Sequence, residues 1–454
     1  MSSDDTQMFE PELDGIITFG PCAEDVVFDG LLFVRLHWVD LSGVLRTRLV
    51  STDLFMRLFH LKGEHLLVQH CMSKPIFAFQ KPAFAESERW SLHVDPRSLR
   101  QCRLVENHAI AFCTTSYQDL AVNVGNKLSN CPRSLLGRVA KKLAKASGAQ
   151  VLLGFEIQFT LLDKHMNPVE FNQTGNCFKV AGLRGSTLQI MNEVTEVLLQ
   201  YRVGIREFYC ESDGQLKVIL SPLPVVEAVD ALMLAQETIR AIFLRHELKA
   251  TMTVMPSQAT LPQLSRNGCP MHTYLNGIDE SKSNAFIAGI LDKVPALCAF
   301  GMPHEESYCR IGYDGGAGEY VGWGSEPRGL PIRKISYDQW EFRFFDATAN
   351  MYLAVAATLV SGLNGIQQKR KLAARDCSIS LECLGFGELK DYGITQMMPK
   401  SLEDSLSTAI TDTDMREWLG DKLFDDYTVV KMDEMKAISA LSAEDRRLKY
   451  LQLF

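Results

Sequence analysis

The stretch GFEIQF carries two side chains that could bind a cation or a polar substrate. Its period-2 alternation predicts a strand with the phenylalanines and the isoleucine on one face and Glu156 and Gln158 on the other. A carboxylate is a typical ligand of Mg²⁺ or Mn²⁺, whereas a carboxamide brings no charge. The chemistry of this stretch therefore depends on whether Glu156 is a ligand and on what Gln158 does beside it.

Three further strand-like segments, CESDGQLKVIL, NGCPMHTYL and QWEFRFF, carry polar residues of the same kind. They supply Glu211, Lys217, His272 and Glu341. Carboxylate and imidazole groups suit Mg²⁺ or Mn²⁺ better than they suit zinc–thiolate chemistry. A lone Glu on a strand is more often a solvated residue, so these side chains gain weight as a site only if the segments converge.

Four arginines accompany these segments and could hold an anion. They are Arg310, Arg328, Arg333 and Arg343. A guanidinium group presents forked donors that match a carboxylate or a phosphate. The sequence therefore favours a pocket for an anionic substrate.

The elements that must position these residues fall into two predicted domains. Residues 1–25 are acidic and polar, and we expect them to be disordered. Residues 26–128 read as short strands and loops, and residues 129–454 as strands mixed with long helices. The predicted fold class is α+β, with a small N-terminal β-rich domain ahead of a large α+β domain.

Local signals are clearest in four segments. The run 31–50 alternates on both sides of a DLSG turn and predicts a β-hairpin. A helix is predicted over 132–147, where proline marks the first turn, and another over the amphipathic run 225–248. A nearly all-apolar helix is predicted over 347–365, closed by its final glycine. The region beyond about residue 395 reads as charged and helical.

Composition excludes several classes of partner. The net charge of -8 and the absence of a basic patch argue against nucleic acid and acidic membrane surfaces. No apolar run approaches the ~18 residues of a membrane span, and the acidic start lacks the features of a secretory signal. The 12 cysteines are scattered and form no CxxC pair, which is typical of buried, reduced thiols. We therefore expect a cytoplasmic protein.

The order and spacing of many short blocks resemble those of the glutamine synthetase family, in its type I-like branch, over nearly the whole chain. The blocks are LLFVRLHWVDLSGVLRTRLV, SLHVDPRSLR, CPRSLLGRVAKKL, GFEIQFTLL, CESDGQLKVIL, NGCPMHTYL, ESYCRI, WGSEPRGLPIR and WEFRFFDATANMYLAVAATLVSGLNGI. The resemblance implies an N-terminal β-grasp domain followed by a catalytic domain built on an antiparallel half-barrel sheet covered by helices.

Function follows from the same resemblance. The family uses ATP to phosphorylate the side-chain carboxylate of glutamate, and ammonia or an amine then displaces the phosphate. One divalent cation neutralises the ATP phosphates, and a second organises the glutamate side. The family also assembles as stacked rings of identical subunits, so we expect a homo-oligomer.

Residues of the family site carry over unevenly. The phosphate-side cation would be held by Glu156, His272 and Glu341, which are all present. ATP or its phosphates would contact Arg328, Arg333 and Tyr274, where Tyr274 replaces a family histidine. The substrate carboxylate would be held by Asn267, Gly268, Arg310 and Arg343.

The substrate-side cation has lost its ligands. The three family carboxylates correspond to Gln158, Glu211 and Lys217, so a formal charge of -3 becomes zero. An ammonium about 4 Å from a dication would cost roughly 8 kcal/mol at an effective dielectric near 20. We expect at most one Mg²⁺, with Lys217 in place of the second cation and paired to Glu211. The alternative is that the strand register slips by one residue and Lys217 faces solvent.

Three functions remain open at this stage. The first is a repurposed enzyme that acts on a carboxylate, either as a different amide ligase with ATP as a possible cofactor or in an ATP-independent reaction. Its catalytic residues would be Lys217, Glu211 and Arg328. Lys217 would then stabilise negative charge, or act as a base if burial lowers its pKa. The second is an inactive pseudoenzyme that serves as a scaffold or regulator. Ordinary glutamine synthesis is the least supported, because it needs the lost carboxylate cluster.

Overall fold

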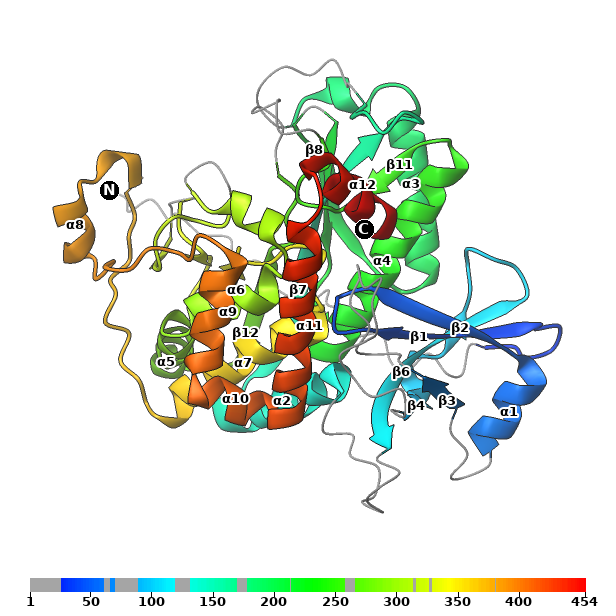
Figure 1. Ribbon diagram of the computed structural model, residues 1–454, viewed down its shortest axis with the longest axis horizontal. Coiled ribbons are helices and arrows are strands. Elements are labelled where there is room, and N and C mark those ends of the chain that lie inside the picture. Colours follow the sequence, from blue (N-terminus) through cyan, green and yellow to red (C-terminus); the bar gives the residue numbers. More distant parts are fainter. Residues whose placement is uncertain are drawn as a thin grey trace, which may run out of the picture.

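A computed structural model describes residues 26–60, 66–69, 89–118, 131–169, 178–212, 214–257, 266–312, 316–325, 329–379 and 381–454. The segment 1–25, which the sequence predicts to be disordered, lies outside these ranges, as does the connection 119–130 at the predicted domain boundary. The predicted α+β class is confirmed, with a β-rich N-terminal part beside a larger part of sheet and helices (Figure 1).

The N-terminal domain is a sheet of six strands in the order β2-β1-β6-β4-β3, with β5 paired to β6. The predicted hairpin is present as β1 and β2, in antiparallel register with Phe33 opposite Ser51. One face of β1 packs into the core through its buried side chains Val34, Leu36 and Trp38. Its elements are β1 (Phe33–Val39), β2 (Leu45–Ser51), α1 (Thr52–His60), β3 (Leu66–Gln69), β4 (Arg89–Val94), the 3-10 turn η2 (Pro96–Ser98), β5 (Arg100–Gln101) and β6 (His108–Gln118).

The second domain is built on a curled sheet of nine strands, in the order β13-β14-β15-β12-β7-β9-β8, with β10 and β11 also paired to β7. This is the half-barrel that the family resemblance implies. The strands are β7 (Gln150–Leu162), β8 (Ile205–Ser212), β9 (Gln215–Leu220), β10 (Leu223–Pro224), β11 (Lys249–Thr251), β12 (Met271–Asn276), β13 (Trp323–Gly324), β14 (Ile332–Lys334) and β15 (Gln339–Phe342).

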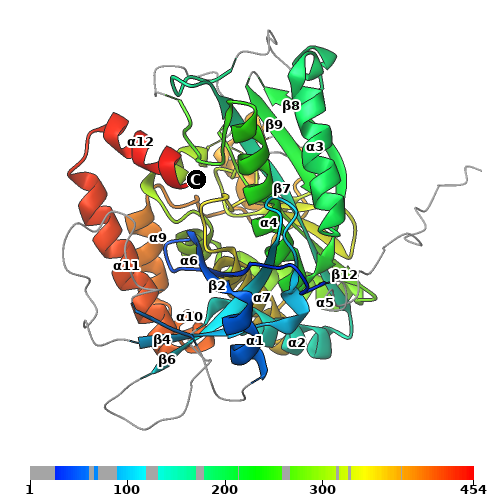
Figure 2. The same ribbon diagram turned by 90° about the vertical axis from the view of Figure 1, so that its right-hand side faces the viewer.

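Helices cover this sheet and continue to the end of the chain (Figures 1 and 2). They are α2 (Pro132–Ser147), α3 (Ser186–Gln200), α4 (Val225–Arg245), α5 (Glu280–Leu291), α6 (Val294–Gly301), α7 (Met351–Gln367), α8 (Phe386–Asp391), α9 (Leu402–Thr411), α10 (Thr413–Leu419), α11 (Asp421–Ser439) and α12 (Ala443–Leu453), with 3-10 turns η4 (Val180–Leu183), η5 (Glu305–Arg310) and η7 (Leu381–Cys383). No single helix in these ranges is both long and apolar enough to cross a membrane.

One sequence prediction about α7 is wrong. Gly365 does not close the helix, which continues to Gln367, because this glycine serves helix packing instead. A Cβ at Gly365 would lie 2.1 Å from the carbonyl oxygen of Ala285, and the α5 residue Gly289 faces it at similarly close range. Helices α5 and α7 therefore approach closely through paired glycines.

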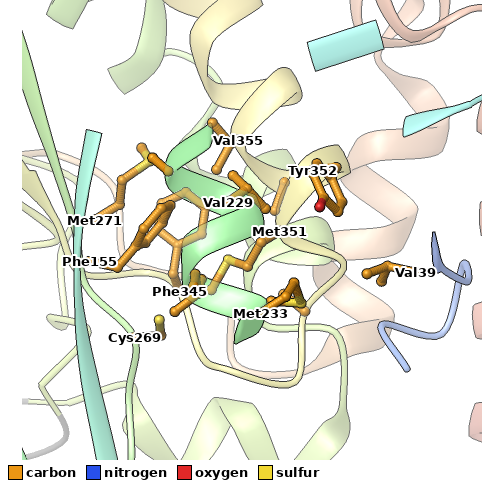
Figure 3. Packing of buried hydrophobic residues seen from close by; sticks show 14 of the residues in the cluster. Val39, Phe155, Val229, Met233, Cys269, Met271, Phe345, Met351, Tyr352 and Val355 are labelled. Carbon is orange, nitrogen blue, oxygen red and sulfur yellow. The ribbon is translucent and has the colours of Figure 1, made fainter. Parts of the chain in front are cut away.

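The hydrophobic core joins strands and helices of both domains. Figure 3 shows Phe155 of β7 and Met271 of β12 beside side chains of α4 and α7, and Val39 of the N-terminal sheet belongs to the same cluster. The nine cysteines in the described residues are all free, and seven of them are buried. For these nine, the prediction of buried thiols holds in all but Cys309 and Cys383.

The turn between β1 and β2 is inserted into the second domain. Gly43 has φ +90°, and a Cβ there would lie 2.1 Å from the carbonyl oxygen of Thr348. The Asn350 side chain, which caps α7, donates to the carbonyl of Asp40 at 2.8 Å. The Ser42 hydroxyl contacts the buried carboxylate of Glu434 on α11. The hairpin turn thus fixes the N-terminal domain against the start of α7.

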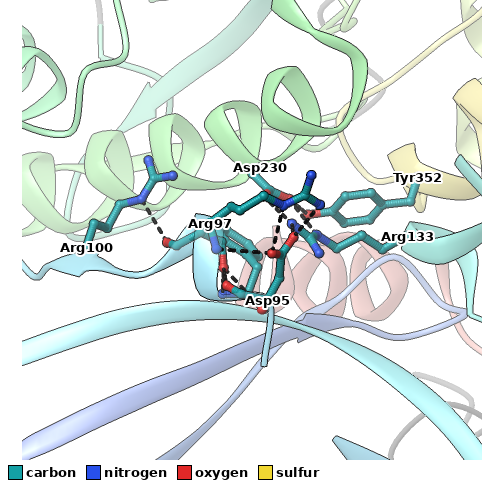
Figure 4. Close-up of polar contacts among 8 residues, drawn as sticks. Asp95, Arg97, Arg100, Arg133, Asp230 and Tyr352 are labelled. Atoms are coloured by element: carbon teal, nitrogen blue, oxygen red, sulfur yellow. Dashed lines mark hydrogen bonds and ion pairs between the residues drawn. The ribbon is translucent and has the colours of Figure 1, made fainter. Parts of the chain in front are cut away.

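A buried ionic network makes a second connection between the domains (Figure 4). The guanidinium of Arg133 on α2 donates to both oxygens of Asp230 on α4, at 3.0 and 2.7 Å. It also donates to Asp95 of the N-terminal domain at 2.9 Å. The hydroxyl of Tyr352 on α7 donates to Asp230 at 2.5 Å. Three helices and the N-terminal sheet therefore meet at one bidentate ion pair.

Removing one member of this network should strongly destabilise the fold. We expect Asp230→Asn to lower the free energy of unfolding by about 3 kcal/mol, because the buried Arg133 loses its main counterion. The measurement is urea unfolding followed by circular dichroism. Asp421→Asn is the control, since Asp421 pairs with Arg416 in an exposed position and should change stability by less than about 1 kcal/mol. Equal effects of the two substitutions would contradict this role.

Candidate active site

Adjacent strands of the second sheet bring the polar segments together, as the sequence hypothesis requires. Strand β9 lies between β7 and β8, and β12 lies between β7 and β15. Gln158 on β7 and Tyr209 on β8 are both register partners of Lys217, on either side of β9. His272 on β12 faces Glu341 on β15. The side chains that the sequence singles out therefore share one region of the sheet.

Lys217 lies at the centre of this region. Its ammonium is 3.0 Å from a carboxylate oxygen of Glu156 and 3.1 Å from one of Glu211. Both carboxylates are diagonal neighbours of Lys217, one on each flanking strand, which is the geometry in which long side chains meet across a sheet. The register of β8 shifts beside Glu211, and such bulges re-aim a side chain. The predicted pairing of Lys217 with Glu211 is confirmed.

The contact between Lys217 and Glu156 was not predicted. It places the ammonium against Glu156, a predicted ligand of the phosphate-side cation, as well as against Glu211. The Lys217 side chain is only 11 % exposed, so the alternative in which it turns to solvent is excluded. Its ammonium also lies over the ring of Tyr209, 5.6 Å from the centroid.

Gln158 has a defined structural role in place of a ligand. Its amide nitrogen donates to Glu211 at 2.9 Å, and its amide oxygen accepts from the backbone N–H of Gly268 at 2.7 Å. A carboxylate at this position could accept from Gly268 but could not donate to Glu211. The amide of Gln158 therefore links Glu211 on β8 to the loop at Gly268, whereas a carboxylate in its place would repel Glu211.

Glu156 is fully engaged by side chains of the chain itself. One oxygen is 2.8 Å from Nε2 of His272 and the other meets Lys217. Burial alone would raise the pKa of Glu156, but the hydrogen bond from His272 and the charge of Lys217 outweigh it and lower the pKa to about 2. Glu156 is therefore a carboxylate at all physiological pH values.

Lys217 is held in its charged form. Burial would lower its pKa, but the charges of Glu156 and Glu211 outweigh burial and raise the pKa above the usual value for lysine. The idea that burial turns Lys217 into a base is wrong for this arrangement. Only its role as a fixed positive charge remains.

Glu341 and two predicted anion-binding arginines form a second cluster. Arg343 donates to both oxygens of Glu341, at 2.9 and 3.3 Å, and Arg333 lies 3.5 Å from the same carboxylate. Arg343 and Glu341 are buried, whereas 39 % of the Arg333 side chain is exposed. Arg333 is thus the arginine of this cluster that a solute can reach.

The side chains present do not fit a divalent cation as they are arranged. Glu156, His272 and Glu341 have suitable donor atoms, but Glu156 is bound by Lys217 and Glu341 by arginines. No group of three or more His, Cys, Asp or Glu side chains among the described residues is arranged to hold a metal ion. The single Mg²⁺ suggested by the sequence stays a prediction.

Asn267 and Gly268 form the loop that leads into β12. The buried Asn267 amide accepts from Thr160 and Gln215 and donates to two backbone carbonyls, so it anchors the loop. A Cβ at Gly268 would lie 2.4 Å from a guanidinium nitrogen of Arg310, so only glycine fits. These contacts position the loop, and a role of either residue in substrate binding stays a prediction.

Arg310, predicted to grip the substrate, is buried within the protein. It donates to the carbonyl oxygens of Phe345 and Arg343, at 2.6 and 2.9 Å. Tyr274, the predicted nucleotide contact, accepts a hydrogen bond from Arg206 at 2.8 Å. Arg328 lies outside the described residues.

Sequence reasoning missed Tyr209, whose ring lies beside the Lys217 ammonium, and Arg206, which donates to Tyr274. Tyr209 and Glu211 are two residues apart on one strand and so share a face, a signal that would have found the tyrosine. Arg206 sits where β8 is irregular, with a register shift between Ile205 and Glu207, so simple alternation gives no signal for it.

Comparison with known proteins gives this arrangement its context. The family model "glutamine synthetase, catalytic domain" matches residues 129–450. The chain is similar to the protein fluG of Emericella nidulans, at 33 % identity over 332 residues, which cover 71 % of this chain but only 38 % of that protein. It is also similar to type-1 glutamine synthetase 1 of Dictyostelium discoideum, at 24 % identity over 93 % of this chain and 90 % of that protein.

Solved structures support the same fold. The structure titled "Apo GmaS without ligand" superposes with a TM-score of 0.75 at 20 % identity, covering 92 % of this chain and 96 % of that one. At this level of identity the likeness shows the fold alone. Together with the family match, it confirms the resemblance seen in the sequence. The chain therefore belongs to the glutamine synthetase family and carries its catalytic domain over residues 129–450.

Proposed function

We propose that this chain is a glutamine synthetase-like enzyme repurposed from ATP-dependent carboxylate–amine ligation, acting on a carboxylate substrate and not making glutamine. The observation that carries the proposal is the ammonium of Lys217 between Glu156 and Glu211. Random loss of function would leave unpaired buried charges, which are costly. Here each lost carboxylate is matched by a compensating contact, as Gln158 shows.

The distribution of charge supports a carboxylate and an amine as the two substrates. Around Lys217 two carboxylates face one ammonium, which leaves one net negative charge. Around Glu341 two arginines face one carboxylate, which leaves one net positive charge. A substrate carboxylate would favour the exposed Arg333, and a cationic amine would favour Glu211, whose side chain is 27 % exposed. The neighbouring strands thus present one negative and one positive region, which complement the charges of the amine and the carboxylate.

Lys217 would act through its charge and position. Because it stays protonated, it cannot take a proton from the amine. It instead keeps Glu156 ionised and holds Glu156 and Glu211 in position, which leaves the partly exposed Glu211 as the group able to hold the amine. Arg333 and Arg343 would stabilise negative charge on the carboxylate as it reacts.

Further features belong to the same proposal. ATP is the proposed cofactor, since the family uses it, with at most one Mg²⁺. Stacked rings of identical subunits are likewise proposed, because the family assembles in this way. A cytoplasmic location is proposed from the pattern of free cysteines. Neither nucleic acid nor a membrane is a proposed partner.

A scaffold or regulator is the second candidate. It is favoured by the contacts that Asn267, Arg310 and Glu341 make within the chain itself, which leave fewer groups for a substrate. Such a protein would keep the family fold without binding ATP or a substrate.

A product assay separates the two candidates. The purified chain is incubated with ATP, Mg²⁺, glutamate and one of ammonium, isopropylamine or putrescine, and amides are detected by mass spectrometry. We expect an amide other than glutamine, and its loss in Arg333→Met, whose side chain is exposed enough to spare the fold. Arg416→Met, which removes an exposed ion pair with Asp421, is the matched control. Glutamine as the sole product would refute the proposal of a repurposed enzyme. If calorimetry detects binding of neither ATP nor glutamate, the scaffold is favoured.

The charge balance predicts a pH-dependent loss of stability in Lys217→Met. Without the ammonium, Glu156 and Glu211 repel each other, and we expect the free energy of unfolding to fall by about 3–5 kcal/mol at pH 7. The folded pKa of Glu156, about 2, lies below its ordinary value of 4.5, so its stabilisation is complete above pH 4.5 and is lost as the pH falls towards 2. The gap between wild type and variant should narrow from pH 7 to pH 4, because the variant's unpaired carboxylates take up protons.

Urea unfolding at several pH values measures this gap. Lys282→Met is the control, since Lys282 lies in a partly exposed pair with Asp279 and should give a small, constant difference. A gap for Lys217→Met that does not change with pH would contradict the paired arrangement.

Restoring the family carboxylates should restore cation binding. In Gln158→Glu with Lys217→Glu, four carboxylates and no ammonium would surround the site, so we expect at least one more Mn²⁺ per chain than in wild type. Electron paramagnetic resonance of free Mn²⁺ measures the stoichiometry. Gln158→Glu with Lys217→Arg keeps the positive charge and should bind no more Mn²⁺ than wild type. An unchanged stoichiometry in the first variant would contradict the assignment of these positions.

A further inference from the structure

A cavity of about 420 Å³ lies against helix α12, apart from the Lys217 site. Figure 2 shows α12 near the C-terminal end of the chain. It is enclosed by the segment that follows β11, by the start of η5 and by the first two turns of α12. We name it the α12 cavity and define it by Val254, Met255, His304, Thr348, Ala443 and Tyr450. None of the residues that line it belongs to the cluster around Lys217.

The inner wall of the α12 cavity is aromatic and apolar. The rings of His304 and Tyr450 lie 4.8 Å apart between centroids, at an angle of 57°. Val254, His304 and Tyr450 are all buried. Rings set in this way present faces and edges to a third ring, which is a favourable environment for an aromatic ligand.

His304 is a buried polar side chain of this wall. Neither of its ring nitrogens forms a hydrogen bond within the described residues, although the side chain is only 3 % exposed. Burial, with a smaller effect from the charge of Lys431, lowers the pKa of His304 well below its usual value, so the ring is neutral. A neutral imidazole offers one donor and one acceptor, and leaving both unused in a buried position is costly.

The charged residues of the lining are already paired. Arg446 lies 3.2 Å from Glu306, and Arg447 lies 2.7 Å from Glu444. Arg447 also donates to the carbonyl of Pro256 at 2.8 Å. The lining therefore carries no net charge to recruit an ion, and the neutral ring of His304 is available to recognise a ligand.

We propose that the α12 cavity is a binding site for a small neutral aromatic molecule that carries one hydroxyl or carbonyl group. The aromatic body would pack against Tyr450, Val254 and Met255, and the oxygen would bond to His304. The volume lies within the range of small-molecule pockets, roughly 300–1,000 Å³. This site is independent of the proposed ligase reaction.

Fluorine NMR of the full chain tests the site with a matched pair of probes, 4-fluorobenzyl alcohol and 4-fluorotoluene. They differ only in the hydroxyl group. We expect saturable line broadening of the alcohol, with an affinity at least fivefold tighter than that of the toluene. No saturable broadening of the alcohol up to 5 mM would overturn the proposal, as would equal or weaker affinity than that of the toluene.

Two variants locate the binding. Ala443 is exposed at the mouth of the cavity, so Ala443→Trp should fill the entrance without disturbing the fold and weaken binding at least tenfold. Leu448→Trp lies on the same helix outside the lining and should leave binding unchanged. The variant His304→Phe should still bind 4-fluorotoluene but should no longer bind 4-fluorobenzyl alcohol more tightly. Binding that survives Ala443→Trp, or a preference that survives His304→Phe, would overturn the assignment.

Discussion

The ammonium of Lys217 lies between carboxylates on the two strands that flank its own, and the rest of the site is arranged around this contact. A buried carboxylate needs a counterion, and two of them within reach of each other need it more. In glutamine synthetases that role falls to divalent cations. Here the Lys217 side chain supplies a single positive charge in place of the two charges of a divalent cation. The number of carboxylates around it is correspondingly smaller, because Gln158 is neutral. His272 then binds the free oxygen of Glu156, and Gln158 joins Glu211 to the loop at Gly268.

The scaffold holds these side chains with little freedom. The strands that carry them pack against α4 and α7 through a core that extends into the N-terminal sheet. Arg133 and Asp230 tie α2 and α4 together, and Asp95 brings in the N-terminal domain. The β1–β2 turn fixes the same domain at the start of α7. The backbone positions of Lys217, Glu156 and Glu211 are therefore fixed by well-packed strands, which keep both carboxylates within reach of the ammonium.

Local sequence signals predicted much of the fold. The helix over 132–147 has the bounds that its proline and its apolar spacing indicate, and the hairpin near residues 33–51 follows from alternation about a glycine turn. The pairing of Lys217 with Glu211 needed the family resemblance, because no spacing rule shows which strands are neighbours. Its contact with Glu156 depends on the register between β7 and β9, and the burial of Arg310 depends on carbonyl groups more than 30 residues away. Gly365 was misread because its partner Gly289 is on another helix.

We infer that Lys217 takes the place that a divalent cation holds in the family. A crystal structure of the unaltered chain soaked in Mn²⁺, with anomalous scattering data, tests it most directly. We expect no anomalous peak between Glu156 and Glu211, and density for the Lys217 ammonium within hydrogen-bonding distance of both carboxylates. A manganese ion bound by Glu156 and Glu211, with the Lys217 side chain turned away, would contradict it.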